Sequence, residues 1–134
     1  ETDVDFLKVM AVTWNLQGGC PSLQNLDQLF TKDNVVHDIF VFATWEALKP
    51  IAVSMVLPNK DKMNERIMDY FNDQGKTSNY MMVNSICLAA SHLVVVCKKR
   101  LAAYISNVQN DTLAIGVADM LSNKGAVSIS FNLG

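Results

Sequence analysis

The sequence lacks the features that mark several specialised classes of protein. Its 134 residues contain no unbroken apolar run longer than five residues, whereas a membrane-spanning helix needs about 20. The 11 basic and 13 acidic residues leave a formal net charge of −2, so the chain has no general attraction to nucleic acid. Any anion binding must therefore be local, and we expect no nucleic-acid partner.

Cysteine and histidine are also scarce, and their spacing excludes the common metal motifs. The three cysteines, Cys20, Cys87 and Cys97, lack CxxC spacing, and the last two lie in apolar runs. This pattern favours reduced core thiols in a cytosolic protein. The two histidines have no metal-ligand spacing to a cysteine or an acid. We predict that His37 is a turn residue before a strand and that His92 lies in a hairpin.

Apolar residues are abundant, at 50% of the total, and they form alternating strand-like and helix-like segments. Apolar runs rich in β-branched residues predict strands, and apolar residues at helical spacing predict helices. The predicted strands are 7–14, 37–45, two between 80 and 97, extended pieces at 104–108 and 112–118, and 126–131. The predicted helices are 23–30 and 59–75.

The order of these elements predicts the fold class. A strand–helix–strand–helix opening followed by consecutive strands indicates an α/β (α+β) fold, with a mixed, mostly antiparallel sheet and helices on one face. The other face would then be bare within this chain. Because uncovered apolar sheet favours association, we expect either self-association or a second half that covers this face.

Three polar sites, with four candidate residues in all, stand at the edges of apolar strands. Asn15 ends the first strand, where its carboxamide can hydrogen-bond a ligand or serve as a turn residue. Glu46 ends the second strand, as a hard oxygen ligand suited to Mg²⁺ or as a solvated loop glutamate. Asn123 and Lys124 offer donors to a phosphate, and Gly125 allows close backbone approach; the alternative is a hairpin turn.

The shared placement of these residues favours the functional alternative. Ligand crevices in α/β sheets lie at strand ends. A carboxamide, a carboxylate and an ammonium group together can bind a metal ion and a phosphate. We therefore predict that Asn15, Glu46 and Lys124 converge on one crevice rim.

The stretch LVVVCKKRLAAYISNVQNDTLAIGVADMLSNKGAVSISF, residues 93–131, resembles the inositol polyphosphate 5-phosphatase family. Upstream, VTWN and DIFVFATWE are similar to that family's first two strand motifs. The resemblance implies the fold of the endonuclease/exonuclease/phosphatase superfamily, similar to DNase I, in which two sheets pack face to face with helices outside. Residues 1–134 would then be the N-terminal part of the catalytic domain, about half of a four-layer α/β/β/α sandwich.

The resemblance also implies an activity and roles for residues. The family hydrolyses the 5-phosphate of phosphoinositides or inositol polyphosphates with Mg²⁺, so peripheral membrane contact by a cytoplasmic protein is expected. Glu46 and Asn15 would be the catalytic and metal-site residues: Glu46 would bind the metal, and Asn15 would position the scissile phosphate or the metal's water. Asn123 and Lys124 would lie near the substrate phosphates.

This sequence departs from the family pattern in two ways. Trp45 stands where the family commonly has glutamine. The later Asn-x-His, Gly-Asp-x-Asn and Ser-Asp-His motifs, which supply the catalytic histidine and the group that activates water, are absent from these residues. We therefore expect the 134-residue chain alone to be inactive. The alternative is a catalytically dead phosphoinositide-binding or scaffold module of the same fold; a nuclease is less favoured because the chain lacks a basic surface.

Overall fold

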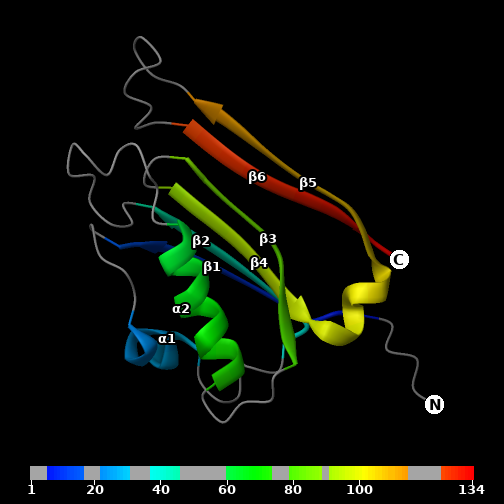
Figure 1. Ribbon diagram of the computed structural model, residues 1–134, viewed down its shortest axis with the longest axis horizontal. Coiled ribbons are helices and arrows are strands. Elements are labelled where there is room, and N and C mark those ends of the chain that lie inside the picture. Colours follow the sequence, from blue (N-terminus) through cyan, green and yellow to red (C-terminus); the bar gives the residue numbers. More distant parts are fainter. Residues whose placement is uncertain are drawn as a thin grey trace.

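The computed structural model describes residues 6–16, 22–30, 37–45, 60–73, 79–88, 91–114 and 125–134. Figure 1 shows the order of the elements along the chain. They are β1 (Val9–Asn15), α1 (Leu23–Leu29), β2 (Ile39–Trp45), α2 (Lys60–Asp73), β3 (Tyr80–Leu88), β4 (Ser91–Lys98), the 3₁₀ helix η1 (Lys99–Tyr104), β5 (Ile105–Ala114) and β6 (Gly125–Leu133). None of the helices in the described ranges is long and apolar enough to cross a membrane.

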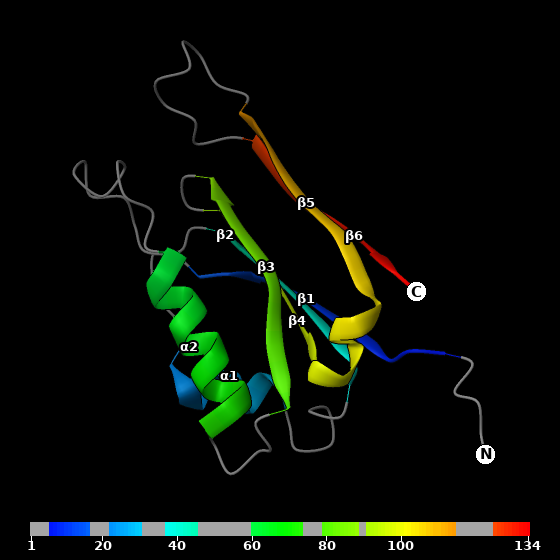
Figure 2. The same ribbon diagram turned by 45° about the vertical axis from the view of Figure 1, so that its right-hand side comes forward.

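The strands form a mixed, mostly antiparallel arrangement, as predicted. A four-stranded sheet has the order β1-β2-β4-β3, and β5 and β6 form a separate two-stranded sheet. β1 and β2 are parallel, whereas β2–β4, β3–β4 and β5–β6 are antiparallel. The predicted α/β fold with helices on one face is confirmed, because α1 and α2 lie together against the larger sheet (Figures 1 and 2).

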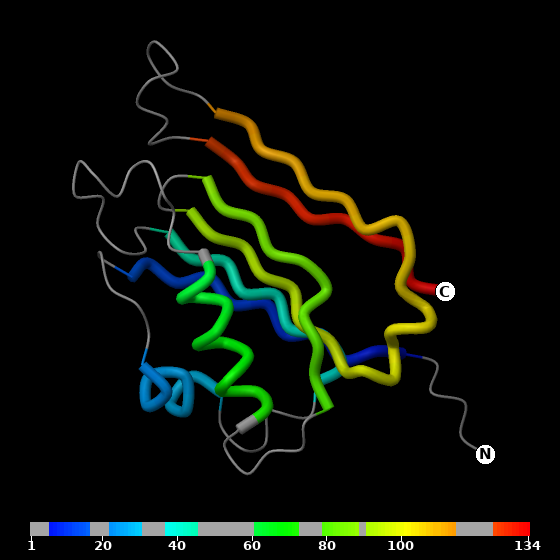
Figure 3. Tube along the Cα trace, viewed as in Figure 1, coloured from blue at the N-terminus to red at the C-terminus, as the bar shows by residue number. Residues whose placement is uncertain are grey.

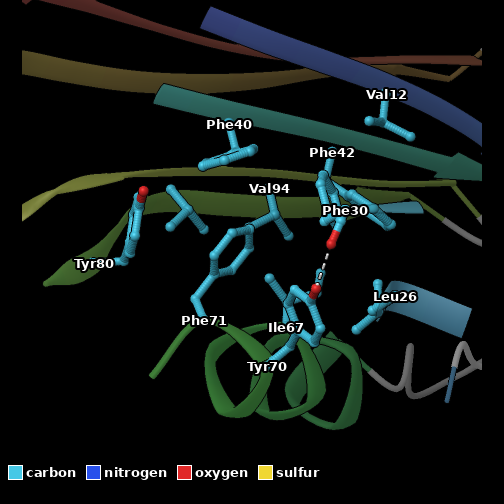
Figure 4. Close-up of a cluster of buried hydrophobic side chains, with 11 residues drawn as sticks. Val12, Leu26, Phe30, Phe40, Phe42, Ile67, Tyr70, Phe71, Tyr80 and Val94 are labelled. Carbon is cyan, nitrogen blue, oxygen red and sulfur yellow. Dashed lines mark hydrogen bonds between the residues drawn. The ribbon is translucent and has the colours of Figure 1, made fainter. Parts of the chain in front are cut away.

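An aromatic core joins the helices to the sheet. Phe30 packs against Phe40, Phe42, Tyr70 and Phe71, with ring centroids 5.5 to 5.9 Å apart. The Tyr70 hydroxyl donates a 2.8 Å hydrogen bond to the Phe30 carbonyl oxygen, drawn as the dashed line in Figure 4. This contact satisfies a buried phenol and fixes the end of α1 against α2.

The helices form where the sequence predicts them, for local reasons. Ser22 caps α1: its Oγ accepts from the Asn25 amide at 3.1 Å, and the Asn25 side chain accepts from the Ser22 amide at 3.1 Å. This reciprocal pair satisfies two backbone donors at the helix start. On α2 the buried residues recur at helical spacing and face the core; they are Met63, Ile67, Tyr70 and Phe71.

The second face of the large sheet is partly covered, so the prediction of a bare face is wrong over β3 and β4. There the β5–β6 hairpin packs Ile105, Ile129 and Phe131 against a second apolar cluster containing Val95 and Cys97. The hairpin runs alongside β3 and β4 (Figure 3). Its strand β6 alternates as predicted, with half-buried apolar residues separated by exposed ones. Burial also raises the pKa of the Cys97 thiol, which fits a reduced core cysteine.

Over β1 the same face remains exposed. Val9 is 56% exposed on β1, and Phe6 before it is 71% exposed. On the hairpin, β5 is exposed along almost its whole length, including Leu113 at 59%. The structure also joins the predicted piece 104–108 to the start of 112–118 in one strand, β5. The bulge between Ser106 and Gln109 contains Asn107, at φ 53°, a left-handed conformation that asparagine tolerates.

A buried carboxylate, Asp38, lies directly before the first residue of β2 and joins three parts of the chain. Asp38, 5% exposed, accepts a 2.9 Å hydrogen bond from the Lys8 amide and is paired with the side chains of Arg100 and Lys98. Burial alone would raise its pKa, but the Lys8 amide, Arg100 and Lys98 together hold the pKa of Asp38 below its ordinary value of 3.8. The basic residues at 98–100 thus include two that hold an internal carboxylate.

Candidate active site

The candidate site is built from the carboxyl ends of β1 and β2. In the parallel register Asn15 lies level with Trp45, the last residue of β2, and the next amide, Leu16, donates a 3.0 Å hydrogen bond to the Trp45 carbonyl. Asn15 is exposed there, and Trp45 is 41% exposed. Glu46 follows Trp45 directly, although it lies outside the described residues. The register therefore places Asn15, which carries the carboxamide, beside Trp45, the residue directly before Glu46.

The start of β6 lies at the same end of the molecule. β4 begins there, since His92 pairs with Thr44 near the end of β2, and Leu88 of β3 pairs with Ser91. A Cβ atom added to Gly125 would lie 2.6 Å from Leu88 Cδ2 and would also collide with the Leu113 carbonyl. Figure 1 shows the ends of β1, β2 and β3 and the start of β6 together at one end.

Gly125 therefore has a packing role in the described structure, whereas the sequence suggested that it allows a phosphate to approach the backbone closely. Without a side chain it lets β6 lie against both β5 and the end of β3. Asn123 and Lys124, the two residues before it, lie outside the described residues. The convergence of Asn15, Glu46 and Lys124 on one rim stays a prediction. The ends of β1 and β2 and the start of β6 nevertheless lie at one end of the fold.

No metal centre is present within the described ranges: no three His, Cys, Asp or Glu side chains there are grouped to hold an ion. Glu46, the predicted metal ligand, falls outside those ranges. The exposed carboxamide of Asn15 beside the strand that leads to Glu46 supplies oxygen donors of the kind that hard cations prefer. The residue types at this strand end thus fit a Mg²⁺ site.

A polar network lies beneath this end of the sheet and was missed by the sequence analysis. His92 Nε2 lies 3.0 Å from Asn64 Oδ1, and Asn64 Nδ2 donates a 2.8 Å hydrogen bond to Ser85 Oγ. His92 is 3% exposed and pairs with Cys87 in the hairpin of β3 and β4, so its predicted place in a hairpin is confirmed. In the two strands the available signal was a polar residue within an apolar run, Ser85 in β3 and His92 in β4. Asn64 gave no such signal, because α2 contains many polar and charged residues.

A family model described as Endonuclease/Exonuclease/phosphatase family 2 matches residues 12–134. Among curated proteins, phosphatidylinositol 3,4,5-trisphosphate 5-phosphatase 1 of Xenopus laevis is 27% identical over 98% of this chain. Phosphatidylinositol 4,5-bisphosphate 5-phosphatase INP51 of Saccharomyces cerevisiae is 23% identical over 93% of it. The chain spans only 13% and 14% of these two relatives' lengths.

Solved structures show the same fold. The inositol polyphosphate 5-phosphatase domain of SPsynaptojanin, in complex with inositol (1,4)-bisphosphate and calcium, has a TM-score of 0.76 and 25% identity, covering 95% of this chain and 36% of that one. A nitric oxide complex of a Cimex nitrophorin variant has a TM-score of 0.61 at 17% identity, covering 95% of this chain and 42% of that one. Because one fold is similar to both, the fold alone does not decide the activity. The family match covers most of the chain, and this chain therefore belongs to endonuclease/exonuclease/phosphatase family 2.

Proposed function

We propose that the intact protein hydrolyses the 5-phosphate of phosphoinositides or inositol polyphosphates with Mg²⁺, and that residues 1–134 are the N-terminal part of its catalytic domain. The observation that carries this proposal is the similarity, over nearly the whole chain, to two phosphoinositide 5-phosphatases and to an inositol-phosphate-bound phosphatase domain. The level pairing of Asn15 with Trp45 supports it, because it places Asn15 beside the strand that leads to Glu46.

Each candidate residue has a distinct role in this proposal. Mg²⁺, when bound, neutralises negative charge that develops on the phosphoryl oxygens. Glu46 is the residue that would hold it, and Asn15 orients the scissile phosphate or a water molecule through its amide. Asn123 and Lys124 donate to the substrate phosphates, as fixed donors do in sites preorganised for phosphate.

The test is phosphate release by the intact protein from vesicles that contain phosphatidylinositol 4,5-bisphosphate and from soluble inositol polyphosphates. We expect release that requires Mg²⁺ and stops when the metal is chelated. The 134-residue chain alone should release nothing above the blank, because the histidine and aspartate motifs of the family are absent from it. Turnover by the pure 134-residue chain would contradict the second part.

A dead phosphoinositide-binding or scaffold module is the second candidate. Trp45, in the position where the resemblance implies glutamine, favours it, because an indole offers one donor in place of a carboxamide's donor and acceptor. In this case the intact protein would sediment with phosphoinositide vesicles and release no phosphate. The same vesicle assay tests peripheral membrane contact, which we propose for a cytoplasmic protein.

Self-association of the 134-residue chain is a further expected outcome. The exposed apolar residues Phe6, Val9 and Leu113 lie on or beside strands that are uncovered in this chain, and such surfaces favour association. Sedimentation velocity over a range of concentrations should show oligomers or aggregation. A monomer at all concentrations with one cooperative melting transition would show that the exposed strands need no cover.

A further inference from the structure

The network of Asn64, His92 and Ser85 connects one helix to two strands through a single side chain. Asn64 Oδ1 can only accept, so the 3.0 Å contact requires a proton on His92 Nε2. Its Nδ2 donates to Ser85 Oγ at 2.8 Å. The Asn64 side chain on α2 therefore uses both atoms of its amide: the oxygen contacts His92 on β4, and the nitrogen donates to Ser85 on β3.

A bulge in β3 places Ser85 on the side where Asn64 can reach it. The β3–β4 register shifts between Met82 and Asn84, and Ser85 then pairs with Val94, a residue of the helix-side core. Without the shift, the alternation of the strand would turn Ser85 toward the β5–β6 hairpin. Bulges commonly re-aim a side chain next to an active site.

The network lies directly beside the end of β2. His92 pairs with Thr44 across β2 and β4, and Thr44 stands two residues before Glu46. Thr44 is 2% exposed. Elsewhere this face of the sheet packs on α1 and α2 through aromatic and aliphatic side chains. Directional hydrogen bonds fix one arrangement of the packed elements, whereas apolar contacts tolerate several.

We propose that Asn64 is a positioning residue, which ties α2 to β4 and β3 and thereby fixes the end of β2 from which Glu46 follows. The proposed effect of Asn64 on the end of β2 is inferred from its two hydrogen bonds and does not depend on the proposed function. Its consequence for metal affinity rests on the proposed function. Removing a group that directly hydrogen-bonds a metal ligand typically changes metal affinity or activity by about 10–100-fold. Asn64 acts one step further out, through His92 and the strand pair β2–β4, so we expect an effect at the lower end of that range.

The experiment replaces Asn64 with leucine in the intact protein, a change close in volume that removes both hydrogen bonds. We expect amide hydrogen exchange at Thr44 and Trp45 to become about 10-fold faster, as loss of two ordinary hydrogen bonds predicts. The Mg²⁺ concentration for half-maximal phosphate release should rise about 10-fold, with KM for the lipid unchanged.

Asn72→Leu is the matched control, because Asn72 lies on the same helix and its buried Oδ1 has no hydrogen-bond partner among the described residues. It should change neither measurement. If Asn64→Leu fails to fold, Ser85→Ala removes one bond of the network and should shift both measurements in the same direction by less.

The outcomes separate this inference from the proposed function. Unchanged exchange at Thr44 and Trp45 in both Asn64→Leu and Ser85→Ala overturns the inference, whether or not the protein has turnover. Equal effects from Asn72→Leu also overturn it, because they would indicate general loosening of α2. Absence of turnover in the unmodified protein overturns the proposed function, and the exchange measurement then decides the inference by itself.

Discussion

Replacing Glu46 with glutamine is expected to lower kcat for phosphate release by the intact protein about 10²–10³-fold, the typical loss when one preorganised electrostatic group is removed from an active site. The substitution keeps the shape of the side chain and removes its charge, and hard cations prefer charged oxygen ligands. The measurement is the initial rate of phosphate release over a range of Mg²⁺ concentrations. Excess Mg²⁺ should restore part of the lost rate if the carboxylate binds metal.

Glu65→Gln is the control for this prediction, since Glu65 lies on the exposed face of α2. It should leave the rate and the Mg²⁺ dependence unchanged. An intact Glu46→Gln protein whose rate stays within a few-fold of the unmodified protein would remove Glu46 from the site. The order of the motifs VTWN and DIFVFATWE would then not support a metal site at the end of β2.

Replacing Asp38 with alanine is expected to destabilise the fold by about 1.5–3 kcal/mol, the typical contribution of a hydrogen bond to a charged group, because the loss leaves Arg100 in water and not as a buried unpaired charge. The carboxylate accepts a hydrogen bond from the Lys8 amide and is paired with Arg100, so its loss loosens the N-terminal segment and η1 together. Urea unfolding measures the change. Because Arg100 is half-exposed, Arg100→Gln should cost less, about 0–1 kcal/mol.

The pH dependence of this contribution has a definite sign. The pKa of Asp38 is lowered in the folded protein relative to its ordinary value of 3.8. Its contribution is therefore fully present above about pH 4 and is lost as the pH falls through the lower folded pKa. The difference in unfolding free energy between the unmodified protein and Asp38→Ala should shrink in acid. A constant difference between pH 7 and pH 3 would contradict this account.

Local patterns predict the elements of this fold well, because each one depends on near neighbours. The apolar face of α2 recurs at helical spacing, and Ser22 and Asn25 cap α1 from three residues apart. The alternation of β6 likewise predicts which of its residues pack on the large sheet. In these cases the residues that decide the structure are close together in the sequence.

The interactions that local patterns did not predict join distant parts of the chain. Arg100 reaches Asp38 across 62 positions, and Asn64 reaches His92 across 28. A basic run and an isolated histidine are each compatible with solvent exposure, so nothing nearby in the sequence identifies their partners. The cover on the second sheet face was not predicted for the same reason. It depends on β5 and β6 packing against β3 and β4, and no local pattern in the sequence specifies that contact.

For the candidate site, the sequence predicts residue types at strand ends, and the structure supports their placement only in part. The pairing of Asn15 with Trp45 follows from the parallel register, which the strand–helix–strand order favours. Glu46, Asn123 and Lys124 lie outside the described residues. Their convergence with Asn15 stays a prediction that the Glu46→Gln experiment tests most directly.

The two ends of β2 differ in what a change there can affect. Asp38 precedes this strand and Glu46 follows it, and seven strand residues span about 20 Å. Exposed charges are largely screened beyond about 8 Å at physiological ionic strength. Acid resistance could therefore be tuned at the Asp38 end of β2, for example at Arg100, whose side chain is 57% exposed, with little disturbance of the electrostatics around a bound phosphate.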